Sequence, residues 1–248
     1  MFSRIVPRYD LMNALMTFGL DRSWRRIAAR EADVDSDTVA LDLACGTGDL
    51  ALELATAGAG RVVGVDFCPE MLAVARQKIE RAGASSVELV EADALRLPFA
   101  SATFDVVTVG FGLRNFADVP AGLAEIARVL KPGGRLVCLE MTHPPFEPFG
   151  WLFRPYFHFV VPLVGGLVSG DHAAYRYLPR SVERFPDAIG LAGLCRTAGF
   201  GAIRYRYLAL GAVALHVAYA RFASGTGPVD SASPESGSPP NEAPERGN

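Results

Sequence analysis

The chain has 248 residues, of which 50% are hydrophobic and 21% are charged, and its formal net charge at pH 7 is -3. This length and composition are typical of one domain with a large buried core and a water-soluble surface. The slightly acidic balance argues against a dedicated nucleic-acid partner, because such proteins normally carry excess Lys and Arg to neutralise phosphates.

The beginning of the chain does not have the pattern of a secretory signal. Arg4, Arg8 and Asp10 stand where a signal peptide would need an apolar run. The four cysteines show no C-x-x-C spacing, so we expect neither disulfides nor a zinc site. Both observations favour a reducing, cytoplasmic compartment.

Apolar, β-branched runs then alternate with amphipathic segments. The apolar runs predict strands at 38–45, 61–67, 86–92, 104–110 and 134–141. Apolar residues at i, i+3 and i+4 predict helices at 49–57, 69–83 and 119–130. Such alternation forms right-handed βαβ units, so we expect an α/β fold with a mostly parallel sheet.

The end of the chain has a different pattern. Two further strand-like runs, 201–210 and 212–220, are separated only by Gly211, which is too short a connection for a crossover helix. These runs should pair antiparallel at the sheet edge. Residues 223–248 are rich in Pro, Gly, Ser and acidic residues, and we expect a disordered tail after a domain spanning 1–222.

A glycine turn follows the first predicted strand. The stretch LDLACGTGDL places Asp42 in the strand and Gly46 and Gly48 in the turn. Glycines are needed where a ligand approaches the backbone closely. Asp66 ends the second strand 20 residues after Gly46, where a carboxylate can accept both hydroxyls of a ribose. The spacing therefore predicts a site for an adenosine-like nucleotide.

Two classes of nucleotide enzyme compete for this pattern. The stretch GTGDLA also satisfies G-x-G-x-x-A, which occurs in Rossmann dehydrogenases that bind a nicotinamide dinucleotide. However, EADALRLPF (91–99) puts Asp93 after the third strand, where it can accept from an adenine amino group while the Ala94 amide donates to the ring. The stretch LKPGG (130–134) then leads into the fifth strand.

These four signals, in this order, resemble the class I S-adenosylmethionine-dependent methyltransferases, which have a Rossmann-like sheet of seven strands with an antiparallel end and helices on both faces. The resemblance implies that S-adenosylmethionine is the methyl donor. It assigns the methionine part to Gly46, Thr47 and Gly48, the ribose to Asp66, and the adenine to Asp93 and Ala94.

Three longer stretches narrow the resemblance. RYDLMN (8–13) with GLDRSWRR (19–26), GFGLRNFAD (110–118) and YRYLPRSVERFP (175–186) are similar to signatures of the ubiquinone/menaquinone biosynthesis C-methyltransferases. This implies C-methylation of a polyprenylated quinol, most often demethylmenaquinol to menaquinol, with the benzoquinol intermediate of ubiquinone biosynthesis as the alternative.

The sequence departs from these signatures at two positions. Gly110, a cofactor-binding position, stands where many members have Ser, and Arg180 stands where the pattern usually has Glu. The first departure puts a side-chain contact to the cofactor in question.

The chemistry that the resemblance implies requires no metal. The methyl of a sulfonium is already activated, so the protein must align the ring carbon and exclude water. The carbon becomes more nucleophilic when a neighbouring hydroxyl is deprotonated or hydrogen-bonded. Arg114 can stabilise a phenolate and Asn115 can orient the quinol or cofactor; the alternative for Arg114 is a surface salt bridge. His172 and Tyr175 are further catalytic candidates, although each such residue is more often structural.

Two regions are expected to surround the substrate. Residues 1–35 should form an N-terminal helical cover over the cofactor, unless Tyr9, Asp10 and Asn13 merely cap their own turn. Residues 142–186 should form an insert that faces substrate and lipid. Its apolar run, 149–170, is too interrupted to span a bilayer, so it is either a buried core helix or an interfacial segment that admits the prenyl tail.

We therefore expect a prenylated quinol as substrate and a peripheral membrane surface, at the inner face, as partner. A homo-oligomer is left open. Two other functions also stay open: a methyltransferase of nucleic acid or of a soluble metabolite, and a non-catalytic assembly factor that binds a nucleotide and lipid.

Overall fold

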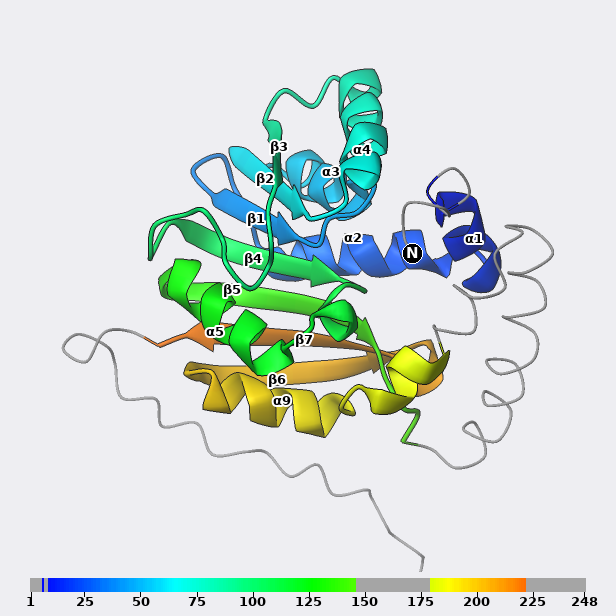
Figure 1. Ribbon diagram of the computed structural model, residues 1–248, viewed down its shortest axis with the longest axis vertical. Helices are drawn as coiled ribbons and strands as arrows, with labels where there is room; N and C mark the ends of the chain where they lie inside the picture. Colours follow the sequence, from blue (N-terminus) through cyan, green and yellow to red (C-terminus); the bar gives the residue numbers. More distant parts are fainter. Residues whose placement is uncertain (1–5, 7–8, 146–178, 222–248) are drawn as a thin grey trace, which may run out of the picture.

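A seven-stranded sheet organises the residues that the computed structural model describes, which are 6, 9–145 and 179–221 (Figure 1). The strands follow the order β3-β2-β1-β4-β5-β7-β6. Their bounds are β1 Val39–Leu43, β2 Arg61–Asp66, β3 Val87–Glu91, β4 Phe104–Gly110, β5 Leu130–Met141, β6 Phe200–Leu208 and β7 Val213–Ala220. Strands β1 to β5 pair in parallel, whereas β7 lies antiparallel between β5 and β6. The expected α/β fold with an antiparallel C-terminal pair is confirmed.

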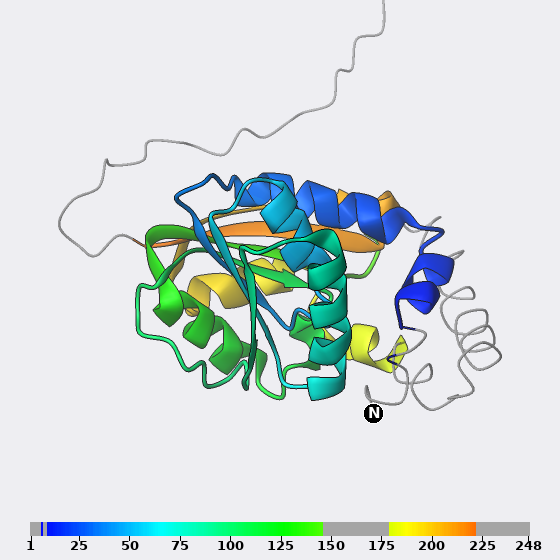
Figure 2. The ribbon, with the colours of Figure 1, turned by 90° about the horizontal axis from the view of Figure 1, so that it is seen from above.

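Helices cover both faces of this sheet (Figure 2). The helices are α1 Tyr9–Met16, α2 Leu20–Ala32, α3 Asp49–Thr56, α4 Pro69–Ala82, α5 Val119–Val129 and α9 Ala188–Thr197. Because neighbouring residues of a strand point to opposite faces, β1 contributes to two cores. Leu41 and Leu43 pack on the side of α5 and α9, and Ala40 packs on the side of α2 and α3.

Local signals account for the helix boundaries. Pro69 opens α4, where its missing N–H costs nothing, and Gly83 ends it in the left-handed conformation with φ 63°. Asp118 caps α5 by accepting a hydrogen bond from the Ala121 amide. The three helices predicted after β1, β2 and β4 are confirmed with nearly these bounds.

The fifth strand begins earlier than the sequence predicted. Leu130 already pairs with Phe104, and a register shift between Phe104 and Val106 absorbs the turn that we expected to separate helix from strand. Helix α9 was not predicted. Of the expected insert, residues 146–178 lie outside the described residues, as does the expected tail 223–248. None of the helices in the described ranges is long and apolar enough to cross a bilayer.

Candidate active site

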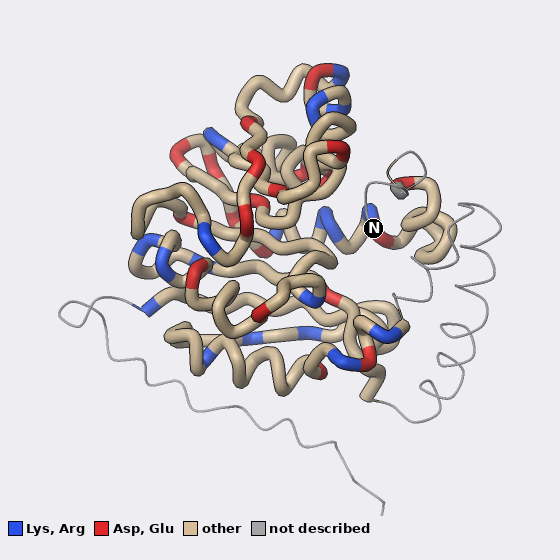
Figure 3. The backbone as a smooth tube through the Cα atoms, in the orientation of Figure 1, with Lys and Arg blue, Asp and Glu red and all other residues tan. Residues whose placement is uncertain are grey.

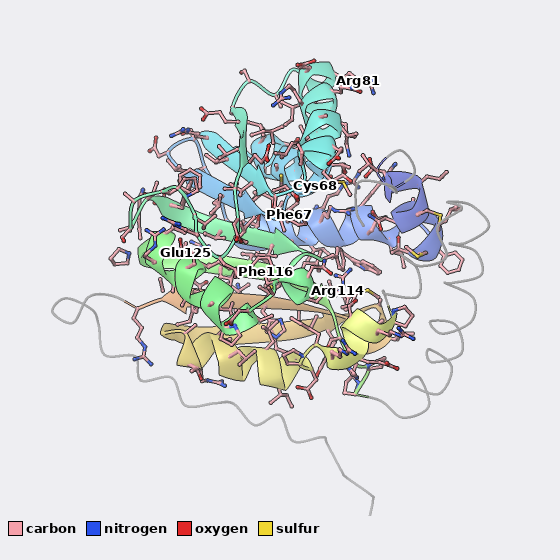
Figure 4. All side chains as sticks on the ribbon, viewed as in Figure 1. Phe67, Cys68, Arg81, Arg114, Phe116 and Glu125 are labelled. Atoms are coloured by element: carbon pink, nitrogen blue, oxygen red, sulfur yellow. The ribbon has the colours of Figure 1, made fainter. Side chains whose placement is uncertain are left out.

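A cleft of about 340 Å³ lies at the carboxyl ends of β1, β2 and β4. This is the edge of an open α/β sheet at which ligands generally bind. Six residues that the sequence predicted for the site line the cleft: Gly46, Asp66, Asp93, Ala94, Gly110 and Asn115. Two aromatic side chains, Phe67 after β2 and Phe116 after β4, complete its walls (Figure 4).

The glycine turn after β1 needs its glycines for two reasons. Gly46 and Gly48 have φ values of 55° and 81°, a left-handed conformation that residues with a Cβ rarely adopt. At Gly48, moreover, an added Cβ would lie 3.1 Å from the Cβ of Ala75 in α4. The turn therefore exposes backbone to the cleft and also lets α4 approach the start of α3.

Asp66 connects the end of β2 to this turn. Its Oδ2 accepts a hydrogen bond from the Gly46 amide at 2.8 Å, and its Oδ1 accepts one from the Cys68 amide at 2.9 Å. The residue is only 7% exposed, and burial raises the pKa of its carboxyl despite these amide bonds. Each oxygen has a further lone pair, so the carboxylate can also accept hydroxyl groups from a ligand in the cleft.

The turn after β3 forms the opposite end of the cleft. The Asp93 carboxylate accepts from the Leu95 amide at 2.9 Å, which fixes the turn, and Asp93 itself is exposed toward solvent. Ala94 and Leu95 line the cleft beside it. This end offers an acidic acceptor, an amide and apolar surface, a combination that suits a purine ring.

A second, smaller hollow of about 30 Å³ adjoins the cleft, sharing Ala44, Gly46 and Gly110 with it. Its polar lining comes from Arg25, Asp42, Thr47 and Asp49. Arg25 forms a salt bridge with Asp21 in its own helix and lies 3.8 Å from Asp49. The sequence analysis missed Arg25 as a site residue, although it lies in the stretch GLDRSWRR that carried the resemblance.

Thr47 belongs to a polar cluster that joins the glycine turn to the three helices α1, α3 and α4. Its hydroxyl donates to Asp10 Oδ1 of α1 at 2.7 Å. Lys78 of α4 donates to Asp10 Oδ2 at 3.0 Å, to Thr47 Oγ1 at 3.2 Å and to Asp49 Oδ1. The N-terminal helix is thereby held against the glycine turn. Lys78 was not predicted, because nothing in its helix pattern distinguishes it from a solvated lysine.

Arg114 and Asn115 lie in the 3-10 turn η3, Leu113–Asn115, after β4. The Arg114 guanidinium donates to Glu140 Oε1 at 2.5 Å and to the Phe111 carbonyl, and its amide donates to Glu140 Oε2 at 3.1 Å. Side-chain exposure is 10% for Arg114 and 1% for Glu140, so the ion pair is buried and is not a surface salt bridge. Asn115 lines the cleft, whereas Arg114 braces the turn beside it (Figure 4).

Other predicted positions are not placed by the structure. His172 and Tyr175 lie outside the described residues. Within 6, 9–145 and 179–221, no group of three or more His, Cys, Asp and Glu side chains is arranged to hold a metal ion.

Comparisons with known proteins agree with this geometry. Residues 1–220 match the model of the ubiE/COQ5 methyltransferase family. The chain is 53% identical over 218 residues to a demethylmenaquinone methyltransferase of Thermus thermophilus, covering 88% of this chain and 98% of that protein. It is 42% identical over 221 residues to the ubiquinone/menaquinone biosynthesis C-methyltransferase UbiE of Klebsiella pneumoniae, covering 88% of each chain. In fold it is similar to a SAM-dependent methyltransferase from Aquifex aeolicus, with a TM-score of 0.55, 17% identity, and coverage of 75% of this chain and 82% of that one.

Proposed function

Because the chain belongs to the ubiE/COQ5 methyltransferase family, we propose that it transfers the methyl group of S-adenosylmethionine to a ring carbon of demethylmenaquinol in menaquinone biosynthesis. The observation that carries the proposal is the 53% identity to a demethylmenaquinone methyltransferase over nearly the whole of that protein. A benzoquinol substrate is the second candidate, favoured by the relative whose name includes ubiquinone.

The lining of the cleft suits S-adenosylmethionine in its chemistry. Exposed backbone at Gly46 suits the methionine end, a buried carboxylate at Asp66 suits two hydroxyls, and Asp93 with Ala94 suits an adenine. When bound, this cofactor supplies a methyl group on a sulfonium, which requires no metal for activation. Thr47, Gly48 and Gly110 complete the proposed cofactor-binding set.

The residues after β4 are proposed to act on the quinol. Asn115 lines the cleft, where its amide can orient the ring or the cofactor. Arg114 carries a charge one residue away and is anchored to Glu140, so its position is fixed before any ligand arrives. We propose that this charge favours the deprotonated ring oxygen, with His172 and Tyr175 as further groups at the ring. Phe67 and Phe116 can exclude water from the reacting atoms.

A prenyl tail on the proposed substrate would favour the bilayer, so we propose that the enzyme works at the bilayer surface. We propose that residues 142–186, rich in aromatic and aliphatic side chains, meet the lipid at the inner face of the membrane and admit the prenyl tail. Because α1 is held against the glycine turn through Asp10, residues 1–35 are proposed to cover the cofactor at the glycine turn.

One incubation tests the proposal. Purified protein receives labelled S-adenosylmethionine with demethylmenaquinol, with the demethylated ubiquinol precursor, or with a naphthoquinol that has no tail. We expect label in the menaquinol product and much less in the other two. Asp66→Ala serves as the control for methyl transfer that does not depend on the site. Binding of the cofactor without transfer to any quinol would favour the non-catalytic alternative.

A further inference from the structure

The end of β4 leads into a residue with an unusual backbone. Phe111 has a φ of 60°, in the left-handed region that residues with a Cβ rarely adopt. Residues keep this conformation only where their surroundings fix it, and they gather at functional sites. Phe111 also lines the cleft, just before the turn η3 that carries Arg114 and Asn115. The strained backbone therefore lies where the chain enters the proposed active site.

Two hydrogen bonds of the Phe111 backbone fix this conformation. Its amide donates to the Leu139 carbonyl of β5 at 2.7 Å, and its carbonyl accepts from the Arg114 guanidinium. The next residue, Gly112, brings the chain close to the end of β1, because an added Cβ would lie only 2.6 Å from the Cβ of Ala44. The backbone at Phe111 thus helps to set where the Arg114 guanidinium lies.

The ring of Phe111 connects the same turn to helix α2. Its centroid lies 6.2 Å from the centroid of the Trp24 ring system, at an interplanar angle of 56°. The Arg25 guanidinium carbon lies 6.0 Å from the Phe111 centroid, and Arg25 is itself held by its salt bridge with Asp21. Both separations are in the range of stabilising aromatic and cation–π contacts. A glycine would make the turn without strain, so the ring supplies what the backbone alone does not, an anchor on α2.

We propose that Phe111 is a positioning residue for methyl transfer: its ring, packed on Trp24 and Arg25, anchors the turn that presents Arg114 to the methyl acceptor. Phe111 acts through Arg114 and needs no contact of its own with the reacting atoms. The inference rests on the proposed function, because it takes the Arg114 charge to favour the deprotonated ring oxygen. Without the anchor, the guanidinium keeps its bond to Glu140 but no longer has a fixed distance to that oxygen.

A double-mutant cycle on the intact protein tests this dependence. Methyl transfer from S-adenosylmethionine to demethylmenaquinol is measured for the wild type, Phe111→Gly, Arg114→Met and the double variant. Phe111→Gly keeps the left-handed turn but removes the ring, and its kcat should fall about three- to tenfold, the equivalent of one aromatic contact. In the Arg114→Met background the same change should lower kcat less than about twofold, because residues that act as a unit are not additive.

Trp24 tests the anchor from α2, since it is not among the described residues that line the cleft. Trp24→Leu should lower kcat while the dissociation constant of S-adenosylhomocysteine, measured by calorimetry, stays unchanged. Trp24→Phe keeps an aromatic partner for Phe111 and should retain most of kcat. Melting temperatures check that each variant folds, and if Phe111→Gly does not fold, Trp24→Leu takes its place in the cycle with Arg114→Met.

Ala102 provides a matched control for relief of backbone strain. It has a φ of 55° too, but it is exposed in the loop that precedes β4, at the edge of the sheet away from the cleft. Ala102→Gly should therefore be at least as stable as the wild type and turn over at the same rate.

Three results would contradict the inference. The same loss of kcat from Phe111→Gly with and without Arg114 would overturn the positioning role and leave the ring as a packing residue. A loss of cofactor affinity in Trp24→Leu as large as its loss of kcat would do the same. If the wild type binds S-adenosylhomocysteine but transfers no methyl group to the quinol, the proposed function fails, and this inference with it.

Discussion

The buried pair of Arg114 and Glu140 allows the structural and chemical roles of the arginine to be separated. In Arg114→Met, Glu140 keeps its bonds from the Arg114 and Met141 amides, but it loses the guanidinium that neutralises it. Breaking a buried ion pair by removing one partner typically costs about 3–5 kcal/mol. Because two amide donors remain, we expect a loss near the lower end, about 3 kcal/mol of unfolding free energy.

Chemical denaturation of three proteins measures this loss: the wild type, Arg114→Met, and Arg114→Met combined with Glu140→Gln. The second substitution removes the unpaired charge, so the double variant should regain most of the lost stability. Its turnover should nevertheless stay about a hundred- to a thousandfold low, since the charge proposed to stabilise the ring oxygen is absent. Full recovery of turnover would limit Arg114 to bracing the turn. A single variant as stable as the wild type would refute the reasoning about the buried pair.

Four other changes have defined outcomes. Asp66→Ala should weaken cofactor binding measured by calorimetry by at least tenfold, because hydrogen bonds to a charged group contribute about 1.5–3 kcal/mol each; an unchanged dissociation constant would remove Asp66 from the site. Lys78→Met should raise the cofactor dissociation constant and speed proteolysis within α1, since it breaks the bonds to Asp10 and Thr47; cleavage at the wild-type rate would show that α1 is held by other contacts. Asp42→Asn should raise the melting temperature at pH 8 but hardly at pH 4. Burial raises the pKa of Asp42 to about 7 in the folded protein, so the wild type loses stability as pH rises toward that value and the variant does not. An equal effect at both pH values would contradict this. Deleting residues 223–248 should leave melting temperature and turnover unchanged, and a large loss in either would mean that the tail contributes to the fold.

The fold and several residues that line the cleft were predictable because their signals are local. The sheet followed from apolar runs, and the antiparallel end followed from the short connection between the runs 201–210 and 212–220, although the structure places the connection between β6 and β7 at residues 209–212. The bond between Gly46 and Asp66 joins residues at a fixed spacing along one βαβ unit, which makes it readable from sequence.

Other features depend on contacts that no local pattern records. Glu140 belongs to β5 and meets Arg114, 26 residues earlier in the chain, only because β4 and β5 are neighbours. Lys78 meets Thr47 through the packing of α4 on the glycine turn. Helix α9 did have a signal in Asp187, which caps it through the Gly190 amide, but two internal glycines weaken its helical pattern.

The charges around the glycine turn give a reason why the proposed site can distinguish the methyl donor, S-adenosylmethionine, from its product, S-adenosylhomocysteine. Figure 3 shows Asp and Glu residues among strands β1 to β3 and the segments that follow them. Lys78 pairs with Asp10 and Asp49, whereas Asp42 and Asp66 are buried and make no salt bridge within the described part of the chain. S-adenosylmethionine has a sulfonium and an ammonium, and methyl transfer removes the first of these charges. In the proposed cofactor site, carboxylates at these two positions would attract the donor more strongly than S-adenosylhomocysteine, because Coulomb interactions are weakly screened away from water. The proposed site would thus favour departure of the product once the methyl group has been transferred.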